Sequence, residues 1–144
     1  MDILIIAGGT GGHIYPALSI AQEFRNNGSS ISWIGQKKSL EEKICQDEKF
    51  TFYPIKTKGF LGKGLREKIS AIFILAIGFI KSFFLMKRIK PDLIISTGGY
   101  VSIAPGLIGS LFVPLFIHEQ NSIAGLANKI LHLRSRLTFE AFPS

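Results

Sequence analysis

The stretch Ile3-Leu4-Ile5-Ile6-Ala7-Gly8-Gly9-Thr10-Gly11-Gly12-His13 decides the fold, because an apolar run passes directly into a turn rich in glycine. The apolar run predicts a buried strand, and the pattern from about residue 16 predicts a helix. Glycines let a ligand approach the main chain closely, and the N-terminus of a following helix favours an anion. The turn therefore predicts a site for a phosphate or pyrophosphate, although such turns also serve as simple connections.

Two familiar nucleotide-binding fingerprints do not fit the glycine-rich segments. The pattern G-x-G-x-x-G, started at Gly9 and Gly11, needs a third glycine where this chain has Ile14. An NAD-binding protein also needs an acidic residue at the end of the second strand, and here Gln36 follows that strand. Residues 59–64 (GFLGKG) lack the spacer and the Ser or Thr of a P-loop. These mismatches argue against a dinucleotide-dependent oxidoreductase and a P-loop NTPase.

The composition is that of one domain of ordinary size. The 144 residues suffice for one hydrophobic core and leave no room for a second domain. The one cysteine, Cys45, has no disulfide partner, and His118 and His132 lack metal-ligand spacing, so we expect a reducing cytoplasmic setting without metal or cofactor. We expect no signal peptide, because no basic segment precedes the first apolar run. Residues 142–144 follow a predicted strand directly, which indicates a domain boundary.

The positive charge is concentrated in one segment. The formal net charge is +7, and residues 56–90 contain nine Lys or Arg against one acidic residue, a net +8 that leaves −1 for the remainder. An acidic partner is therefore expected to bind at this segment. Nucleic acid is disfavoured as that partner, because the basic residues alternate with aliphatic rather than exposed aromatic side chains.

Strand-like and helix-like patterns alternate along the whole chain. We predict strands at residues 2–7, 31–35, 51–56, 92–96, 114–118 and 136–141. We predict helices at about residues 16–27, 39–46, 66–89, 102–111 and 123–133. The strands are apolar on both sides, as in parallel sheets that helices cover on both faces. The sequence therefore predicts an α/β fold, a doubly wound, Rossmann-like parallel sheet with strand order 3-2-1-4-5-6.

Three polar or glycine-rich segments follow predicted strands and are expected to meet. The first is the turn that ends at His13, the second is residues 96–102 (STGGYVS), and the third is residues 118–122 (HEQNS). In doubly wound sheets, ligands bind beyond the carboxyl ends of the strands, where the strand order reverses. We therefore predict one binding crevice to which all three segments contribute.

Residues 69–86 raise the question of a membrane span. These eighteen residues contain one charge, Lys81, and approach the length of a transmembrane helix. We predict instead a crossover helix, because the segment joins two strands of one sheet. One buried face does not require apolar residues nearly all the way round. The additional apolar residues favour peripheral contact of residues 56–90 with an anionic membrane surface. The alternative is that the helix has a wide apolar stripe in the core and a solvated basic face.

Several motifs together resemble the MurG family of N-acetylglucosaminyltransferases. They are residues 8–13 (GGTGGH) with Pro16, residues 98–102 (GGYVS), residues 118–121 (HEQN), residues 124–129 (AGLANK) and the loop at residues 59–64. The resemblance covers the whole chain. It implies an inverting, metal-independent transferase with two Rossmann-like domains, the GT-B architecture, bound peripherally at the cytoplasmic face of the bacterial cell membrane.

The resemblance also implies what the protein acts on. Members of the family move GlcNAc from UDP-GlcNAc to the 4-hydroxyl of undecaprenyl-pyrophosphoryl-MurNAc-pentapeptide in peptidoglycan synthesis. Residues 1–144 resemble only the N-terminal, acceptor-binding domain, and the C-terminal domain that holds most of the UDP-GlcNAc pocket is absent. We therefore expect an acceptor-binding and membrane-associating domain without turnover of its own. The alternative is a non-catalytic subunit that recruits a catalytic partner to the membrane, as in a split GlcNAc transferase.

The first loop carries the main candidate for catalysis. By resemblance, Thr10, Gly11 and Gly12 line the UDP-GlcNAc side of the cleft between the domains. His13 is the candidate base for the acceptor hydroxyl, because the helix dipole favours the neutral imidazole. Its alternative roles are donor of a hydrogen bond to the acceptor pyrophosphate and simple helix cap.

The other two loops carry the remaining candidates. Gly98, Gly99 and Tyr100 form a second glycine turn before a helix and a candidate pyrophosphate cradle, although Tyr100 is equally suited to be a buried aromatic. Asn121 is expected to cap the helix that begins near residue 123 and, by resemblance, to contact the donor. Glu119 is the runner-up base, with a structural ion pair as the alternative.

Overall fold

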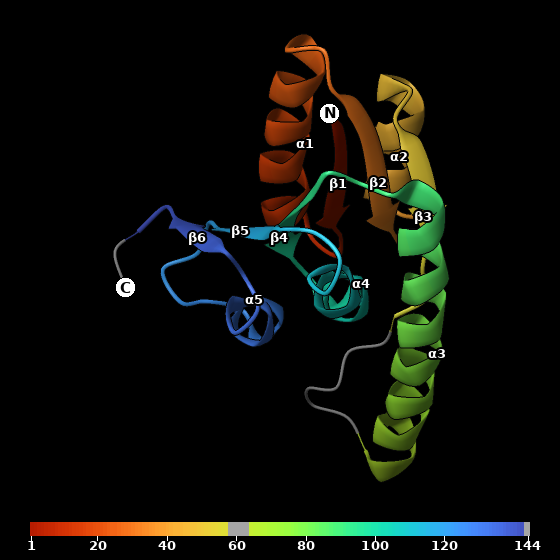
Figure 1. The fold of residues 1–144 in the computed structure, drawn as a ribbon. Coiled ribbons are helices and arrows are strands. Elements are labelled where there is room, and N and C mark those ends of the chain that lie inside the picture. The colour runs from red at the N-terminus through yellow and green to blue at the C-terminus, as the bar shows by residue number, and fades with distance from the viewer. Residues whose placement is uncertain (58–63, 143–144) are drawn as a thin grey trace.

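Parallel strands form the centre of the molecule (Figure 1). The computed structural model describes residues 1–57 and 64–142, in which six strands pair in the order β3-β2-β1-β4-β5-β6. The strands are β1 (Asp2–Ala7), β2 (Ser30–Gly35), β3 (Thr51–Pro54), β4 (Leu93–Gly98), β5 (Leu115–Glu119) and β6 (Leu137–Glu140). Every pairing is parallel. The predicted doubly wound sheet and its strand order are therefore confirmed.

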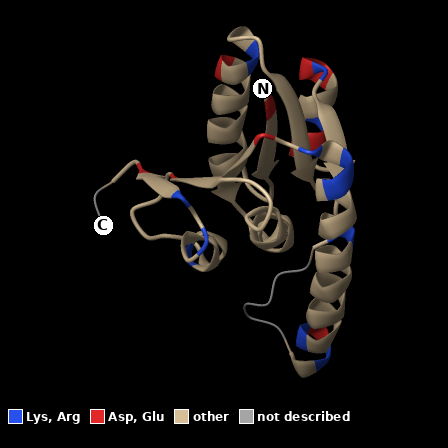
Figure 2. Ribbon diagram, in the orientation of Figure 1, with Lys and Arg blue, Asp and Glu red and all other residues tan. Residues whose placement is uncertain are grey.

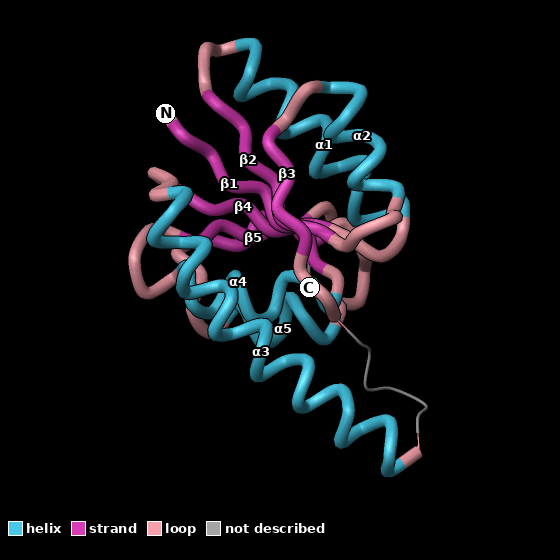
Figure 3. The backbone as a smooth tube through the Cα atoms, turned by 90° about the vertical axis from the view of Figure 1, so that its right-hand side faces the viewer, coloured by secondary structure: helices cyan, strands magenta, loops and turns pink. Residues whose placement is uncertain are grey.

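Helices cover both faces of the sheet (Figure 3). One face carries α1 (Gly11–Asn26) and α2 (Leu40–Glu48), and the other carries α3 (Leu65–Ile89), α4 (Ile103–Gly109) and α5 (Leu126–His132). A short 3-10 helix precedes α4. The alternation of side chains along β1 builds both cores, because Ile3 and Ile5 pack on the α1 side whereas Leu4 and Ile6 pack on the α3 side.

Two predicted helix starts are wrong, and both corrections concern residues near the site. α1 begins at Gly11 rather than near Pro16, because the Thr10 carbonyl already accepts hydrogen bonds from the N–H groups of His13 and Ile14. α5 begins at Leu126 with Gly125 as its N-cap, so the predicted cap at Asn121 does not exist. The other strand and helix bounds differ from the predicted ones by at most two residues.

α3 covers the sheet with only part of its length. Leu85 and Met86 pack into the core, and Gly78 lets the helix approach Ala104 of α4. Figures 1 and 3 show the N-terminal half of α3 extending beyond the sheet. The helix is long and apolar enough to cross a membrane, with a mean hydropathy of 2.3, and 28% of its most apolar window is buried. It joins β3 to β4, as predicted, and most of the preceding glycine-containing loop (residues 58–63) lies outside the described residues.

Candidate functional site

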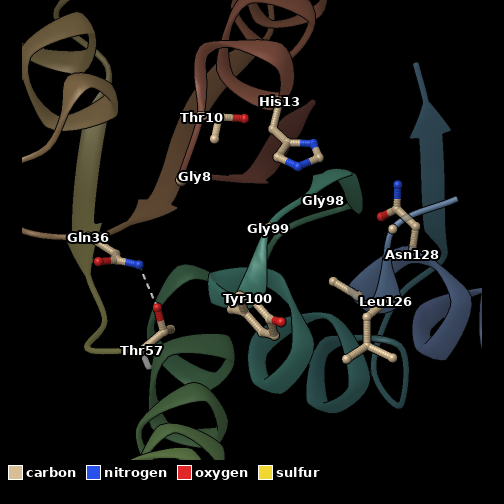
Figure 4. A pocket seen from close by; sticks show the side chains of 13 residues that line it. Gly8, Thr10, His13, Gln36, Thr57, Gly98, Gly99, Tyr100, Leu126 and Asn128 are labelled. Carbon is tan, nitrogen blue, oxygen red and sulfur yellow. Dashed lines mark hydrogen bonds between the residues drawn. The ribbon is translucent and has the colours of Figure 1, made fainter. Parts of the chain in front are cut away.

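A cavity lies at the carboxyl ends of β1 and β4, beside the start of α5 (Figure 4). Its volume is about 300 Å³, and it is lined by residues 8–10, 13, 36, 57, 98–100 and 125–128. We call it the glycine cavity. The structure therefore brings together Thr10, His13, Gly98, Gly99 and Tyr100, which come from two predicted loops far apart in the sequence.

The third predicted loop contributes only indirectly. Residues 118–122 do not line the glycine cavity, whereas residues 125–128 do. The three loops still meet as predicted, because the Gln120 side chain contacts the His13 ring and the Thr97 carbonyl, while the first turn of α5, which starts later than predicted, lines the cavity itself. Gly11 and Gly12 lie in the first turn of α1, next to Thr10, and are not part of the lining.

His13 is held by the last residues of β4. Its Nδ1 donates to the Thr97 carbonyl oxygen at 2.9 Å, and the Thr97 hydroxyl donates to the His13 carbonyl oxygen at 2.6 Å. The Gln120 amide, oriented with its nitrogen toward the carbonyls of Thr97 and His118, places its oxygen 2.5 Å from the same Nδ1. Because both neighbours accept from Nδ1, the neutral ring carries its proton there and keeps the lone pair on Nε2.

The turn after β4 requires glycine at two positions. Gly98 and Gly99 have φ angles of +110° and +89°, which side chains rarely tolerate. A Cβ on Gly98 would lie 3.1 Å from the His13 ring, and a Cβ on Gly99 would lie 2.1 Å from the Gly8 carbonyl oxygen. The two glycine turns therefore pack directly against each other, and both contacting residues line the glycine cavity.

Glu119 is a structural anchor rather than an exposed acid. Its carboxylate is 3% exposed and accepts hydrogen bonds of 2.8–3.1 Å from the Asn121 backbone and side chain, the Gly125 N–H and the Asn128 side chain. Burial by itself raises the pKa of Glu119, but these hydrogen bonds outweigh it and lower the pKa below the usual value. Its described partners are amides, so the expected ion pair is not what holds it.

Asn128 lines the glycine cavity, although the sequence interpretation gave it no role. It is 4% exposed, and its Nδ2 donates to Glu119 at 2.8 Å. Its Oδ1 has no hydrogen-bond partner in the described part of the chain, and a Cβ on Gly98 would lie 3.2 Å from that oxygen. The only signal in the sequence was its position inside the motif at residues 124–129.

The Glu41 side chain packs against the first glycine turn, and the sequence interpretation gave this residue no role either. It is 1% exposed, and its Oε1 accepts a hydrogen bond from the Gln36 N–H at 3.0 Å. A Cβ on Gly8 would lie 2.6 Å from this oxygen, and a Cβ on Gly35 would lie 2.5 Å from the Glu41 Cγ. Both glycines thus make room for a buried carboxylate, which no periodic pattern in the sequence reveals.

His132 and Cys45 lie outside the lining of the cavity. His132 lies on the surface, with Nδ1 2.9 Å from the Thr138 hydroxyl. Burial raises the pKa of the Cys45 thiol to about 12, and Glu41 and Glu42 add to this effect. Within residues 1–57 and 64–142, His, Cys, Asp and Glu form no group of three or more that could hold a metal ion.

The fold and the cavity define the class of protein. A parallel sheet in this order, with a glycine cavity where the strand order reverses, is a Rossmann-like domain, and its similarity to a MurG structure identifies it as the N-terminal half of a GT-B glycosyltransferase. Residues 3–136 match the glycosyltransferase family 28 N-terminal domain, and the chain belongs to this family.

Relatives place the chain within the MurG type of this family. It is 43% identical over 141 residues to the UDP-N-acetylglucosamine--N-acetylmuramyl-(pentapeptide) pyrophosphoryl-undecaprenol N-acetylglucosamine transferase of Buchnera aphidicola, covering 97% of the chain and 40% of the relative. The identically named protein of an Acidovorax species is 39% identical, with coverages of 98% and 36%. The crystal structure of Acinetobacter baumannii MurG superposes with a TM-score of 0.87 at 34% identity, with coverages of 99% and 42%. The chain thus spans well under half the length of these relatives.

Proposed function

We propose that the chain is the acceptor-binding, membrane-associating part of an inverting N-acetylglucosaminyltransferase of peptidoglycan synthesis. In this proposal, residues 1–144 form the acceptor-binding domain, and a donor-binding domain outside this sequence completes the enzyme. The names of the relatives give UDP-N-acetylglucosamine-dependent transfer to a lipid-linked muramyl pentapeptide. The carrying observation is this similarity along nearly the whole chain, together with His13 in the glycine cavity.

The proposed chemistry is attack of the muramoyl 4-hydroxyl oxygen on C1 of the donor sugar. The new C–O bond forms as the bond between C1 and UDP breaks, with inversion at C1, and a base takes the hydroxyl proton. We assign this base to His13, because the Thr97 carbonyl occupies Nδ1 and leaves Nε2 as the acceptor. Its alternative role is donor of a hydrogen bond to the acceptor pyrophosphate.

Glu119 remains the second candidate base, and its surroundings argue against it. Both carboxylate oxygens already accept hydrogen bonds, and the lowered pKa of the carboxyl makes it a weak base at neutral pH. It also lies behind the cavity rather than in its lining. We therefore propose that Glu119 positions the loop that carries Asn121 and Asn128.

The phosphate groups are proposed to bind at the two glycine turns. Gly11 and Gly12, the first residues of α1, present N–H groups that no carbonyl of the helix accepts, and together with Thr10 they suit the phosphates of UDP-GlcNAc. Residues 98–100 are the proposed cradle for the acceptor pyrophosphate. The exposed Asn121 is proposed to contact the donor, as the resemblance implies.

The outward face of α3 is proposed to rest on the cytoplasmic face of the membrane. Phe73, Ile80 and Phe84 recur at helical spacing and are 68%, 63% and 67% exposed. The apolar surface continues beyond the end of α4, because the Phe83 ring lies 5.9 Å from the Phe112 ring. Figure 2 shows basic residues toward both ends of α3, where they suit anionic headgroups. A peripheral position follows, with α3 lying along the surface.

Reconstitution tests the proposed function. We expect no product when the chain alone is mixed with UDP-GlcNAc and the lipid-linked acceptor, and turnover when the C-terminal half of the Buchnera aphidicola relative is added. Efficient turnover by the chain alone would contradict the division of labour. Failure of the chain to bind the lipid acceptor would contradict the acceptor role.

The short span of the chain relative to its relatives favours one alternative, a recruiting subunit of a split transferase. In that case a separately encoded catalytic partner should co-purify with the chain. The complex should also keep its turnover when His13 is replaced by Ala. Loss of turnover in that variant would instead support the catalytic assignment.

A further inference from the structure

A second cavity adjoins the glycine cavity, and lysines surround it. Its volume is about 420 Å³, and it lies between the segment after β2, the end of β3 and α3. Lys37, Lys56 and Lys81 come from these three segments, and we call the cavity the lysine groove. Gln36 and Thr57 line both cavities, and Gln36 Nε2 donates to the Thr57 hydroxyl at 2.5 Å (Figure 4). The two cavities therefore share a wall.

Within the described part of the chain, no carboxylate lines the lysine groove to neutralise its charge. The Lys81 ammonium donates to the Pro54 carbonyl oxygen at 2.6 Å, which fixes a positive charge at the end of β3. The ion pair found among residues 1–57 and 64–142 joins Arg25 and Glu48, and none of the three lysines takes part in it. Cationic groups that converge on one cavity without a carboxylate attract an anionic ligand.

The lysine groove lies about a quarter of a turn round α3 from the proposed membrane surface. Ile74 and Lys81 are seven residues apart, two helical turns, and lie on the side of α3 next to β3. Phe73, Ile80 and Phe84 belong to the outward side of the same helix. The position next to the glycine cavity therefore favours part of the substrate as the occupant.

We propose that the lysine groove binds the peptide of the acceptor through its carboxylates. This inference rests on the proposed function, since it requires the muramoyl sugar to lie in the glycine cavity. The sugar carries its peptide on the lactyl ether at C3, next to the reacting C4 hydroxyl, so a peptide that leaves the glycine cavity enters the adjoining groove. A peptide attached by its amino end keeps its carboxyl end as an anion at neutral pH.

Binding of two acceptor probes tests this inference. The probes are a water-soluble, short-chain prenyl-pyrophosphoryl-MurNAc-pentapeptide with free carboxylates and the same molecule with its carboxylates amidated. We expect Lys37→Met and Lys81→Met each to weaken binding of the free acid about fivefold, without effect on the amidated probe. Lys43→Met removes an exposed charge on α2 outside both cavities and should leave both affinities unchanged. Calorimetric titration gives the dissociation constants.

The possible results separate this inference from the function on which it rests. Equal affinity of the wild-type chain for both probes overturns the peptide site and leaves acceptor binding intact. Binding of neither probe overturns both. An equal loss for both probes in Lys81→Met shows a structural effect and overturns the inference. Loss of binding to phosphatidylglycerol vesicles in that variant, with probe binding unchanged, assigns the groove to a lipid headgroup and also overturns it.

Discussion

α1 and α3 are both crossover helices of one sheet, and they use their apolar residues differently. α1 joins β1 to β2 and buries Ile14, Ala17 and Ala21 against the sheet. α3 joins β3 to β4, but Phe73 and Phe84 on its outer side stay exposed. Covering the sheet accounts for the apolar residues of α1 and for only one side of α3. The comparison teaches that the exposed apolar side chains of α3, which do not cover the sheet, form a separate surface of the molecule.

The two helices also contribute to different sites of the molecule. The start of α1 places His13 in the glycine cavity, where the turn after β4 packs against it. α3 contributes Lys81 to the lysine groove from one side and the exposed aromatic residues from another. Changes at α1 should therefore affect chemistry, and changes at α3 should affect binding of the membrane or of the acceptor peptide, a separation that variants can test.

The largest effect is expected at His13. In the enzyme reconstituted with a donor-binding domain, we expect His13→Ala to lower kcat about a thousandfold, because no general base then removes the proton of the acceptor hydroxyl. Initial rates over a range of acceptor concentrations measure this. A loss confined to the KM for the acceptor would instead assign His13 to the pyrophosphate. Unchanged kinetics would remove α1 from the chemistry altogether.

The second effect concerns the contact that holds the start of α1 against β4. We expect Gly99→Ala to lower the free energy of unfolding by about 3 kcal/mol, because its Cβ meets the Gly8 carbonyl and its φ is positive. Gly9→Ala is the matched control, since Gly9 also has a positive φ but no atom within 4 Å of the added Cβ. It should cost about 1 kcal/mol. Urea denaturation gives both values, and equal losses would refute the contact.

The third effect concerns the loop behind the glycine cavity. We expect Glu119→Gln to lower the free energy of unfolding by about 2 kcal/mol at neutral pH, because an amide nitrogen would face donors. The folded-state pKa of Glu119 is lowered, so its contribution is present above the unfolded value of about 4.5 and is lost as the pH falls through the folded value. The difference between wild type and variant should therefore shrink in acid. Urea titrations across this pH range measure it, and a constant difference would contradict the assignment.

The sequence pattern predicted the fold well because each strand is an apolar run bounded by turns. The strand order follows from parallel strands with right-handed crossovers, and the reversal beside β1 locates the glycine cavity. His13, Gly98 and Gly99 could be predicted because they belong to glycine-rich segments at the carboxyl ends of predicted strands, where doubly wound sheets bind ligands. The packing of Gly99 on Gly8 was not, since it depends on how closely the two turns approach each other.

Sequence reasoning misjudged residues whose role depends on being buried or on a choice between two hydrogen-bond partners. Glu41 is acidic and lies in the first turn of α2, where a charged residue is normally exposed, but the missing Cβ atoms of Gly8 and Gly35 admit it to the interior. Asparagine is a common residue at helix N-caps, but the N–H and the side chain of Asn121 donate hydrogen bonds to Glu119 instead. Such choices depend on the three-dimensional surroundings of a residue rather than on its spacing.

The smallest effect sharpens the comparison of α1 and α3 directly. We expect Phe84→Glu to weaken binding to phosphatidylglycerol vesicles about tenfold, because apolar area and attraction to anionic headgroups are both lost. The matched control on α1 is Tyr15→Glu, which changes a side chain that is 57% exposed. Vesicle flotation measures the bound fraction at moderate salt.

The control decides whether the surplus on α3 is a membrane surface or only a wide apolar stripe. If Phe84→Glu releases the chain from vesicles while Tyr15→Glu does not, the effect belongs to this face and not to the added negative charge. Equal release by both would mean that net charge alone governs binding. Unchanged binding by the α3 variant, with its thermal unfolding also unchanged, would leave the exposed aromatic residues without a lipid partner and would make α3 a crossover helix like α1.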